Sequence, residues 1–176
     1  MRITTIVTLA CWTIALNGCQ SLGTMPASSI ATGLLRLANG APAGSVVVAA
    51  AGDNATITVV AAGLAPGTHG LHLHSAGNCE APAFVSAGGH LNPRSMQHGT
   101  ANPAGSHLGD LPNLTADSSG AGTITAVLRG SRSAVQDALF DADGTAVIIH
   151  AGPDDYKTDP AGNSGTRIAC GVLTRG

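Results

Sequence analysis

Aromatic residues are scarce in this chain, which has one Trp, one Tyr and two Phe among 176 residues. A hydrophobic core must therefore be built from Val, Ile, Leu and Ala. Glycine is abundant, with 24 residues, and this favours short strands joined by glycine turns over helices. The length suits one ordinary domain.

Charge is also scarce, because charged residues make up 10% of the chain and the formal net charge is −2. Nucleic-acid binding needs a basic patch, so the composition argues against a nucleic-acid partner. The apolar run from Ile3 to Leu16 is too short to span a bilayer, but it has about the length of the apolar region of a secretion signal.

The N-terminus therefore predicts export. Residues 1–18 are expected to be a signal peptide, 19–29 a flexible tether and 30–176 the folded domain. Leu16-Asn17-Gly18-Cys19 resembles a bacterial lipoprotein cleavage box, in which Cys19 becomes the lipidated first residue. Asn17 departs from the favoured Ala or Ser, and ordinary secretion with cleavage nearby is the alternative. The expected location is the periplasm or cell envelope, with membrane attachment through Cys19.

The chain has four cysteines. Cys11 lies in the expected signal and Cys19 is the candidate anchor, which leaves Cys79 and Cys170. In an oxidising compartment a disulfide between these two is the natural interpretation, and two buried free thiols are the alternative. The cross-link would close a loop of about 90 residues and contribute at most about 4–5 kcal/mol.

Short apolar or alternating segments separated by turn residues predict an all-β fold. Eight strands are expected, at 30–37, 45–51, 56–62, 69–74, 111–116, 122–128, 145–150 and 166–172, with one short helical turn within 131–143. Eight short strands with glycine turns favour an antiparallel immunoglobulin-like sandwich or barrel. The segment 75–108 has no clean periodicity, and a loop of that length needs something to order it.

Six of the seven histidines lie between Gly67 and Asp110. Side chains alternate faces along a strand, so His72 and His74 point the same way while the leucines at 71 and 73 point into a core. His69 has the opposite parity and is expected to be a buried, hydrogen-bonded structural residue.

A second group comprises His90, His98, His107 and Asp110. Three imidazoles and one carboxylate form a four-coordinate set that suits zinc, and a solvated histidine-containing loop is the alternative. His150 ends the apolar run 146–149, which predicts a buried strand, and it is free to reach a metal held elsewhere.

Longer motifs resemble those of bacterial-type copper/zinc superoxide dismutases. They are G-x-H-G-x-H-x-H at 67–74, G-G-H-x-N-P at 88–93, H-x-G-D-L-P-N-L at 107–114, the strand-end His150 and G-N-S-G-T-R-I-A-C-G-V at 162–172. The resemblance runs from about residue 30 to residue 173. It implies a flattened Greek-key barrel with two long functional loops, superoxide as the substrate, and one copper and one zinc ion per subunit.

The resemblance also implies a role for each site residue. Copper would be bound by His72, His74, His90 and His150, and zinc by His90, His98, His107 and Asp110, so that His90 is shared as an imidazolate. Arg167 would anchor the substrate anion, and His90 would supply a proton. Asp154, rather than its neighbour Asp155, would bridge a copper histidine and a zinc histidine.

Two other functions compete with this interpretation. One is a copper- and zinc-binding envelope protein without turnover, against which Arg167 argues. The other is a structural domain that reuses the fold, against which the complete ligand set argues. The sequence leaves monomer and homodimer open.

Overall fold

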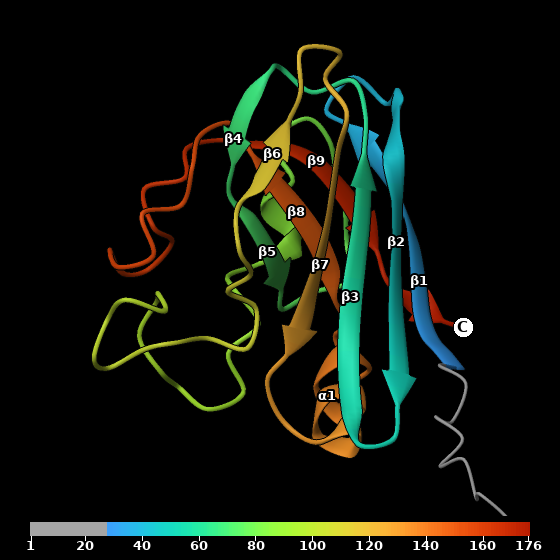
Figure 1. Ribbon diagram of the computed structural model, residues 1–176, viewed down its shortest axis with the longest axis vertical. Helices are drawn as coiled ribbons and strands as arrows, with labels where there is room; N and C mark the ends of the chain where they lie inside the picture. Colours follow the sequence, from blue (N-terminus) through green and yellow to red (C-terminus); the bar gives the residue numbers. More distant parts are fainter. Residues whose placement is uncertain (1–27) are drawn as a thin grey trace, which may run out of the picture.

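The computed structural model describes residues 28–176, so the expected signal peptide, Cys19 and most of the tether lie outside the described residues. The folded part consists mainly of antiparallel strands that curl around one core (Figure 1). The strands are β1 (Ser28–Leu37), β2 (Pro42–Ala51), β3 (Asn54–Ala61), β4 (Gly67–His69), β5 (Leu71–His74), β6 (Leu114–Ala116), β7 (Gly122–Leu128), β8 (Ala146–His150), β9 (Arg167–Val172) and β10 (Thr174–Arg175).

The strand order shows a Greek-key arrangement. The main sheet runs β5-β8-β9-β1-β2-β3-β7, with β10 also paired to β1, and β4 and β6 form a separate pair. Consecutive strands β1, β2 and β3 are neighbours, but β7 and β9 return from later in the chain to flank them. The predicted all-β antiparallel class is confirmed, and the core is aliphatic, with Leu35, Ile57, Leu114 and Ile149 among its fully buried members.

The predicted continuous strand 69–74 is wrong. The chain is divided at Gly70, where β4 pairs with β6 and β5 pairs with β8. A Cβ at Gly70 would lie 2.7 Å from Ser164 Oγ, so the change between sheets occurs where another segment packs against bare backbone.

The predicted helical turn is a helix of two turns, α1 (Arg132–Leu139). The hydroxyl of Ser131 accepts a hydrogen bond from Ala134 N–H and caps its first turn. Val135 and Leu139 are buried against the barrel. Within residues 28–176, no helix has the length and apolar character needed to cross a membrane.

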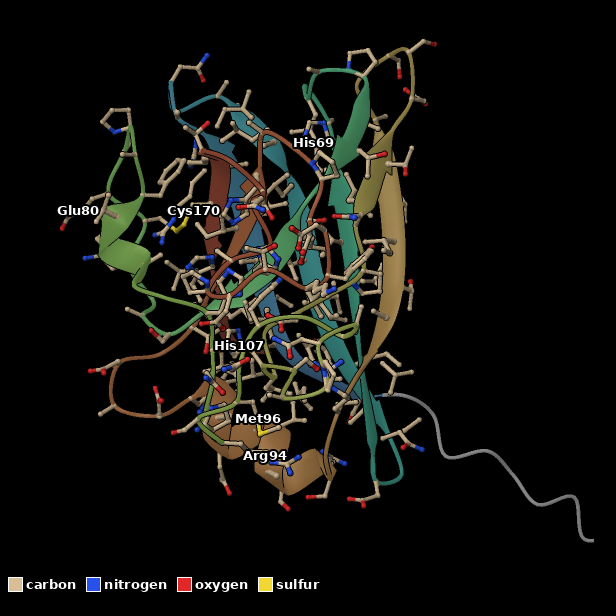
Figure 2. All side chains as sticks on the ribbon, turned by 90° about the vertical axis from the view of Figure 1, so that its left-hand side faces the viewer. His69, Glu80, Arg94, Met96, His107 and Cys170 are labelled. Carbon is tan, nitrogen blue, oxygen red and sulfur yellow. A yellow bond between two sulfur atoms is a disulfide. The ribbon has the colours of Figure 1, made fainter. Side chains whose placement is uncertain are left out.

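Two long loops leave the barrel on one side (Figure 1), one spanning residues 75–113 with a short 3-10 helix at Val85–Ala87, and the other spanning 151–166. The first loop is tied to β9 by a disulfide between Cys79 and Cys170, whose sulfur atoms are visible beside the Cys170 label in Figure 2. The predicted disulfide is therefore present in the fold.

Removal of the disulfide is expected to destabilise the protein. The cross-link joins residues 91 apart in sequence, so Cys79→Ser with Cys170→Ser should lower the free energy of unfolding by up to about 4–5 kcal/mol. Urea unfolding of the metal-free protein, followed by circular dichroism, measures the difference. Equal unfolding free energies for the variant and the wild type would contradict the prediction.

Candidate metal centre

Strand β5 provides the base of the site. His72 and His74 lie on one face of β5 and are 0% and 1% exposed, while Leu71 and Leu73 on the other face belong to the hydrophobic core. The expected alternation is present. His150 ends β8, the strand that pairs with β5, so three imidazoles reach the same place from two neighbouring strands.

The first long loop is joined to β5 by backbone pairing. Leu91 N–H donates to the carbonyl of Leu73, and Leu73 N–H donates to the carbonyl of Gly109, at 2.8 and 2.9 Å. Isolated bridges also pair His74 with His90 and His72 with Asp110. These contacts hold the first long loop, with its histidines, against β5, the strand that carries His72 and His74.

The first cluster consists of His72, His74, His90 and His150, whose ligand atoms all lie within 4.8 Å of one another. Four nitrogens in it, His72 Nδ1, His74 Nε2, His90 Nε2 and His150 Nε2, are buried and have no hydrogen-bond partner. Buried polar atoms are normally paired, so four convergent lone pairs fit a metal ion.

The opposite ring nitrogens of three of these residues are held by oxygen atoms. His74 Nδ1 lies 3.0 Å from the carbonyl oxygen of Gly88, and His150 Nδ1 lies 3.1 Å from that of Gly165. His72 Nε2 lies 2.8 Å from Asp154 Oδ2. Such acceptors hold the proton on that nitrogen and leave the other lone pair free for a metal.

The second cluster consists of His90, His98, His107 and Asp110. Asp110 Oδ1 lies 3.0 Å from His90 Nδ1, 3.0 Å from His98 Nδ1 and 3.1 Å from His107 Nδ1. His98 Nδ1 is close to this oxygen but makes no hydrogen bond. A tetrahedral zinc with bonds of about 2.0–2.1 Å places its ligand atoms about 3.3 Å apart, so the donor set and its spacing fit that ion.

His90 belongs to both clusters. Its Nδ1 faces the second cluster, where it lies 3.4 Å from His107 Nδ1, and its Nε2 faces the first. His90 is therefore the residue that the two clusters have in common.

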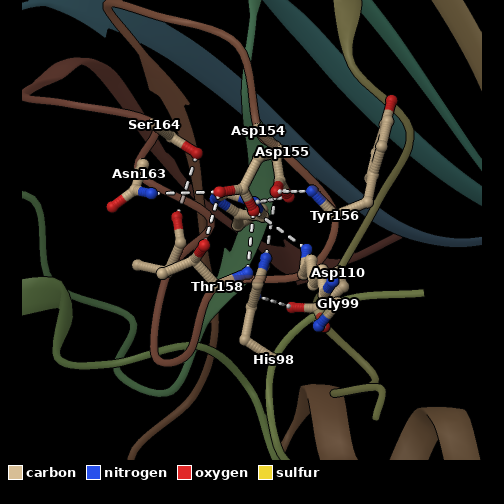
Figure 3. A network of polar contacts seen from close by, with 12 residues as sticks. His98, Gly99, Asp110, Asp154, Asp155, Tyr156, Thr158, Asn163 and Ser164 are labelled. Atoms are coloured by element: carbon tan, nitrogen blue, oxygen red, sulfur yellow. Dashed lines mark hydrogen bonds and ion pairs between the residues drawn. The ribbon is translucent and has the colours of Figure 1, made fainter. Parts of the chain in front are cut away.

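Asp154 contacts a histidine of each cluster, and its contact with His98 is drawn in Figure 3. Its Oδ2 contacts His72 Nε2 at 2.8 Å, and its Oδ1 contacts His98 Nε2 at 3.0 Å. The neighbouring Asp155 is exposed, and its carboxylate accepts hydrogen bonds from Thr158 and Asn163 within its own loop. The bridging geometry thus belongs to Asp154.

Burial favours the neutral form of three imidazoles, those of His74, His90 and His150. It lowers the pKa of His74 to about 2 and that of His150 to about 4. Burial also lowers the pKa of His90 to about 4, although the hydrogen bond to Asp110 partly offsets it. For Asp110 and Asp154 burial opposes ionisation, but hydrogen bonds from the neighbouring histidines and backbone N–H groups hold the pKa of each carboxyl below its ordinary value.

Arg167 lies at the start of β9 beside the first cluster. Its Nη1 donates to the carbonyl of Phe84 at 2.6 Å and its Nη2 to that of Gly88 at 2.7 Å. Burial lowers the pKa of its guanidinium below the ordinary value of 12.5. The guanidinium nevertheless keeps its positive charge at neutral pH.

A cavity of about 500 Å³ opens onto the clusters, and its lining includes His74, His90, His150, Met96, Asp159 and Arg167. A larger apolar hollow of about 730 Å³ lies outside β1, β2 and β9 and contains none of the cluster residues. The smaller cavity is therefore the route to the candidate metal centre.

His69 has the structural role predicted for it, whereas two other residues that contact the centre were not predicted from the sequence. His69 was expected to be structural, and its two ring nitrogens lie 2.8 and 2.9 Å from the carbonyls of His150 and Ala65. In contrast, Arg129 was not singled out, yet its guanidinium donates to the carbonyls of His107 and Asp110. Asp159 was also missed, and its Oδ1 accepts from His98 N–H at 2.6 Å.

The family model described as copper/zinc superoxide dismutase matches residues 42–173. The chain belongs to the copper/zinc superoxide dismutase family. Enzymes of this family use copper and zinc, and the two histidine clusters could hold such ions. Family membership makes this chain an enzyme of the copper/zinc superoxide dismutase type.

Named relatives agree with the family. A copper/zinc superoxide dismutase of Caulobacter vibrioides is 40% identical over 149 residues, covering 81% of this chain and 84% of the relative. One from Aquifex aeolicus is 45% identical over 120 residues, covering 66% and 70%.

Solved structures with the same fold include a superoxide dismutase-like protein of Bacillus subtilis, with a TM-score of 0.77, 36% identity and coverage of 84% of this chain and 100% of that one. The Cu/Zn superoxide dismutase of Brucella abortus gives a TM-score of 0.65 at 28% identity, with coverage of 83% and 98%.

Gly162→Ala is expected to disturb the bridge made by Asp154. Gly162 has a φ of +63°, and a Cβ there would collide with Asp154 Oδ1 and lie 2.7 Å from His98 Nε2. Displacing the carboxylate should weaken zinc binding about 10–100-fold, as measured by chelator competition. In the control Gly152→Ala the new Cβ approaches nothing closer than 3.4 Å, so zinc affinity should be unchanged. Wild-type affinity in Gly162→Ala would contradict the prediction.

The metal-free protein is expected to lose stability in mild acid. His74, His90 and His150 have a lowered pKa in the folded state, so the unfolded chain takes up protons first below about pH 6.5. Their stabilisation is fully present above that pH and is lost toward pH 4, by up to about 1.4 kcal/mol per histidine per pH unit. Urea unfolding at pH 7 and pH 5 measures the loss, and equal stabilities would refute it.

Proposed function

We propose that this chain catalyses the disproportionation of superoxide to dioxygen and hydrogen peroxide, with copper in the first cluster and zinc in the second. The observation that carries the proposal is His90, whose two ring nitrogens face different clusters. A single imidazole directed at two metal positions has little use in a protein that binds one ion, and it fits a centre in which one metal is supported by the other.

The ligand atoms of the two clusters support copper in the first cluster and zinc in the second. The first cluster offers four imidazole nitrogens, and imidazole binds copper in both oxidation states that a one-electron cycle needs. The second offers three imidazoles and a carboxylate at tetrahedral spacing, which is a typical arrangement for structural zinc. Asp110 Oδ2 is fixed by the N–H groups of Gly99 and His107 at 2.8 and 2.9 Å, so Oδ1 stays directed into the cluster.

A copper ion held by His72, His74, His90 and His150 would supply the one-electron redox chemistry that the reaction needs. The overall reaction converts two superoxide ions and two protons into dioxygen and hydrogen peroxide. His90 Nε2 holds one of these protons between the half-reactions and transfers it to the second superoxide. His90 Nδ1 stays directed at the second cluster meanwhile, so the ring keeps its orientation.

Arg167 binds the anion in this proposal. Two backbone carbonyls hold its guanidinium at the wall of the cavity, and its remaining N–H groups can donate to superoxide. Among residues 28–176, Arg167 is the one Arg or Lys side chain that lines the cavity, and Asp159 is the one Asp or Glu. In the proposal Arg167 therefore acts by direct contact with the anion, next to the positive charge of the bound metals.

We also propose that the enzyme works outside the cytoplasm and protects the cell envelope from superoxide. Support comes from the expected signal peptide and lipoprotein box at the N-terminus and from the disulfide, which persists in oxidising compartments.

Superoxide consumption tests the proposed reaction. The protein is stripped of metal and reloaded with zinc alone or with copper and zinc, and loss of superoxide is followed in each sample. Fast loss that requires copper supports the enzyme. Stoichiometric binding of both metals without turnover would instead favour a metal carrier.

His90→Ala tests the shared position. The variant should retain most of the fold but lose activity and the ordinary copper coordination, because both clusters lose one ligand. Circular dichroism, metal analysis and the copper electron paramagnetic resonance spectrum provide the readouts. Full activity in this variant would rule out a shared histidine.

Arg167→Ala tests the anion contact. It should bind both metals and slow superoxide turnover by about one to two orders of magnitude, the scale of losing one anion-stabilising group. Arg94→Ala is the matched control, because Arg94 is an exposed arginine of the first long loop. Unchanged kinetics in Arg167→Ala, or an equal loss in both variants, would show that Arg167 has no specific role.

A further inference from the structure

Arg129 directly follows β7 on the barrel wall and is not a member of either histidine cluster. Its Nη2 donates hydrogen bonds to the backbone carbonyls of His107 and Asp110, the second at 3.5 Å. His107 and Asp110 supply two of the four ligand atoms of the second cluster. One side chain of the barrel thus contacts both ends of the segment 107–110, which we call the ligand turn.

The middle of the ligand turn is fixed against the barrel by backbone hydrogen bonds. Gly109 N–H donates to the carbonyl of Leu91, and Leu73 N–H donates to the carbonyl of Gly109, both at 2.9 Å. A Cβ at position 109 would collide with the carbonyl oxygen of Leu73, so glycine is needed for this close approach to β5. These bonds hold Gly109 and leave the two ends of the turn to other contacts.

The ends of the ligand turn border a cavity instead of closely packed side chains. The cavity has a volume of about 280 Å³, and its lining includes Leu108, Asp110, Arg129 and Tyr156. Within residues 28–176, Arg129 is the one side chain that donates to the carbonyl of His107 or of Asp110. Packing does not fill this side, so the guanidinium is what holds the two carbonyls there.

The spacing of the two ligands makes the position of the turn important for a metal. His107 and Asp110 are three residues apart, so the backbone between them sets the separation of His107 Nδ1 and Asp110 Oδ1, which is 3.1 Å. Zinc requires its ligand atoms at tetrahedral positions, and groups that orient metal ligands typically change metal affinity 10–100-fold. A guanidinium suits this task because it stays charged and presents several N–H donors in one rigid plane.

We propose that Arg129 is a positioning residue for zinc, which fixes the ligand turn from outside and thereby raises the affinity of the second cluster for the ion. The inference rests on the proposed assignment of zinc to that cluster. A purely structural contact would stabilise the metal-free and the zinc-loaded protein equally. A positioning contact stabilises the zinc-loaded protein more, because binding of zinc to the folded state is then linked to the contact.

Zinc titration of the metal-free full-length chain in competition with a chromophoric chelator tests the proposal. Arg129→Ala should raise the dissociation constant of zinc about 10-fold. Arg129 is exposed, so its removal should leave the circular dichroism spectrum unchanged. Arg129→Lys should recover part of the affinity, because an ammonium group also donates to carbonyl oxygens. Arg132→Ala is the matched control, since Arg132 begins α1 three residues later, and its zinc affinity should equal that of the wild type.

Urea unfolding with and without zinc provides the second readout. The stabilisation that zinc gives should be smaller in Arg129→Ala than in the wild type and in Arg132→Ala. Wild-type zinc affinity in Arg129→Ala, or an equal loss in Arg132→Ala, would overturn the positioning role and leave the proposed reaction standing. A wild type that binds no zinc would overturn the proposed zinc assignment and this inference together.

Discussion

Convergent, unpaired imidazole nitrogens are the constraint on which the rest of the site depends. Burying a polar atom without a partner costs about 1–3 kcal/mol, and His72 Nδ1, His74 Nε2, His90 Nε2 and His150 Nε2 are all buried without one. The fold holds these rings in place through the opposite ring nitrogens of His72, His74 and His150, each of which lies beside an oxygen acceptor. Metal ions would convert the same atoms from a cost into the strongest local interaction.

Three long-range contacts hold the two long loops in place, although the unpaired buried nitrogens destabilise the folded state. Backbone pairing joins residues 91 and 109 to β5, the disulfide joins the first loop to β9, and Asp159 joins the second loop to the backbone of His98. A loop of nearly 40 residues would otherwise be poorly ordered. Each tie lies within a few residues of a cluster member or of Arg167, so order is concentrated where the ligands are.

Local patterns in the sequence identified much of the fold and the site. The alternation of side chains along a strand predicted that His72 and His74 lie on one face and that Leu71 and Leu73 lie on the opposite face. Turn residues predicted the positions of most strands. The motifs grouped the loop histidines and Asp110 by family resemblance. Gly70 was missed as a break because the reason for it, Ser164, is almost a hundred residues away. Arg129 and Asp159 were missed for the same reason, since their partners, His107 and Asp110 for the first and His98 for the second, are distant in sequence.

A single peptide group links Arg167, the residue proposed to bind the anion, to the first histidine cluster. The carbonyl oxygen of Gly88 accepts from Arg167 Nη2 and also holds His74 Nδ1. Any shift of that peptide carries the guanidinium and the imidazole in the same direction. The shared carbonyl thus couples the position of the guanidinium to that of the imidazole, so the spacing between them depends on one backbone oxygen instead of on two separate loop positions.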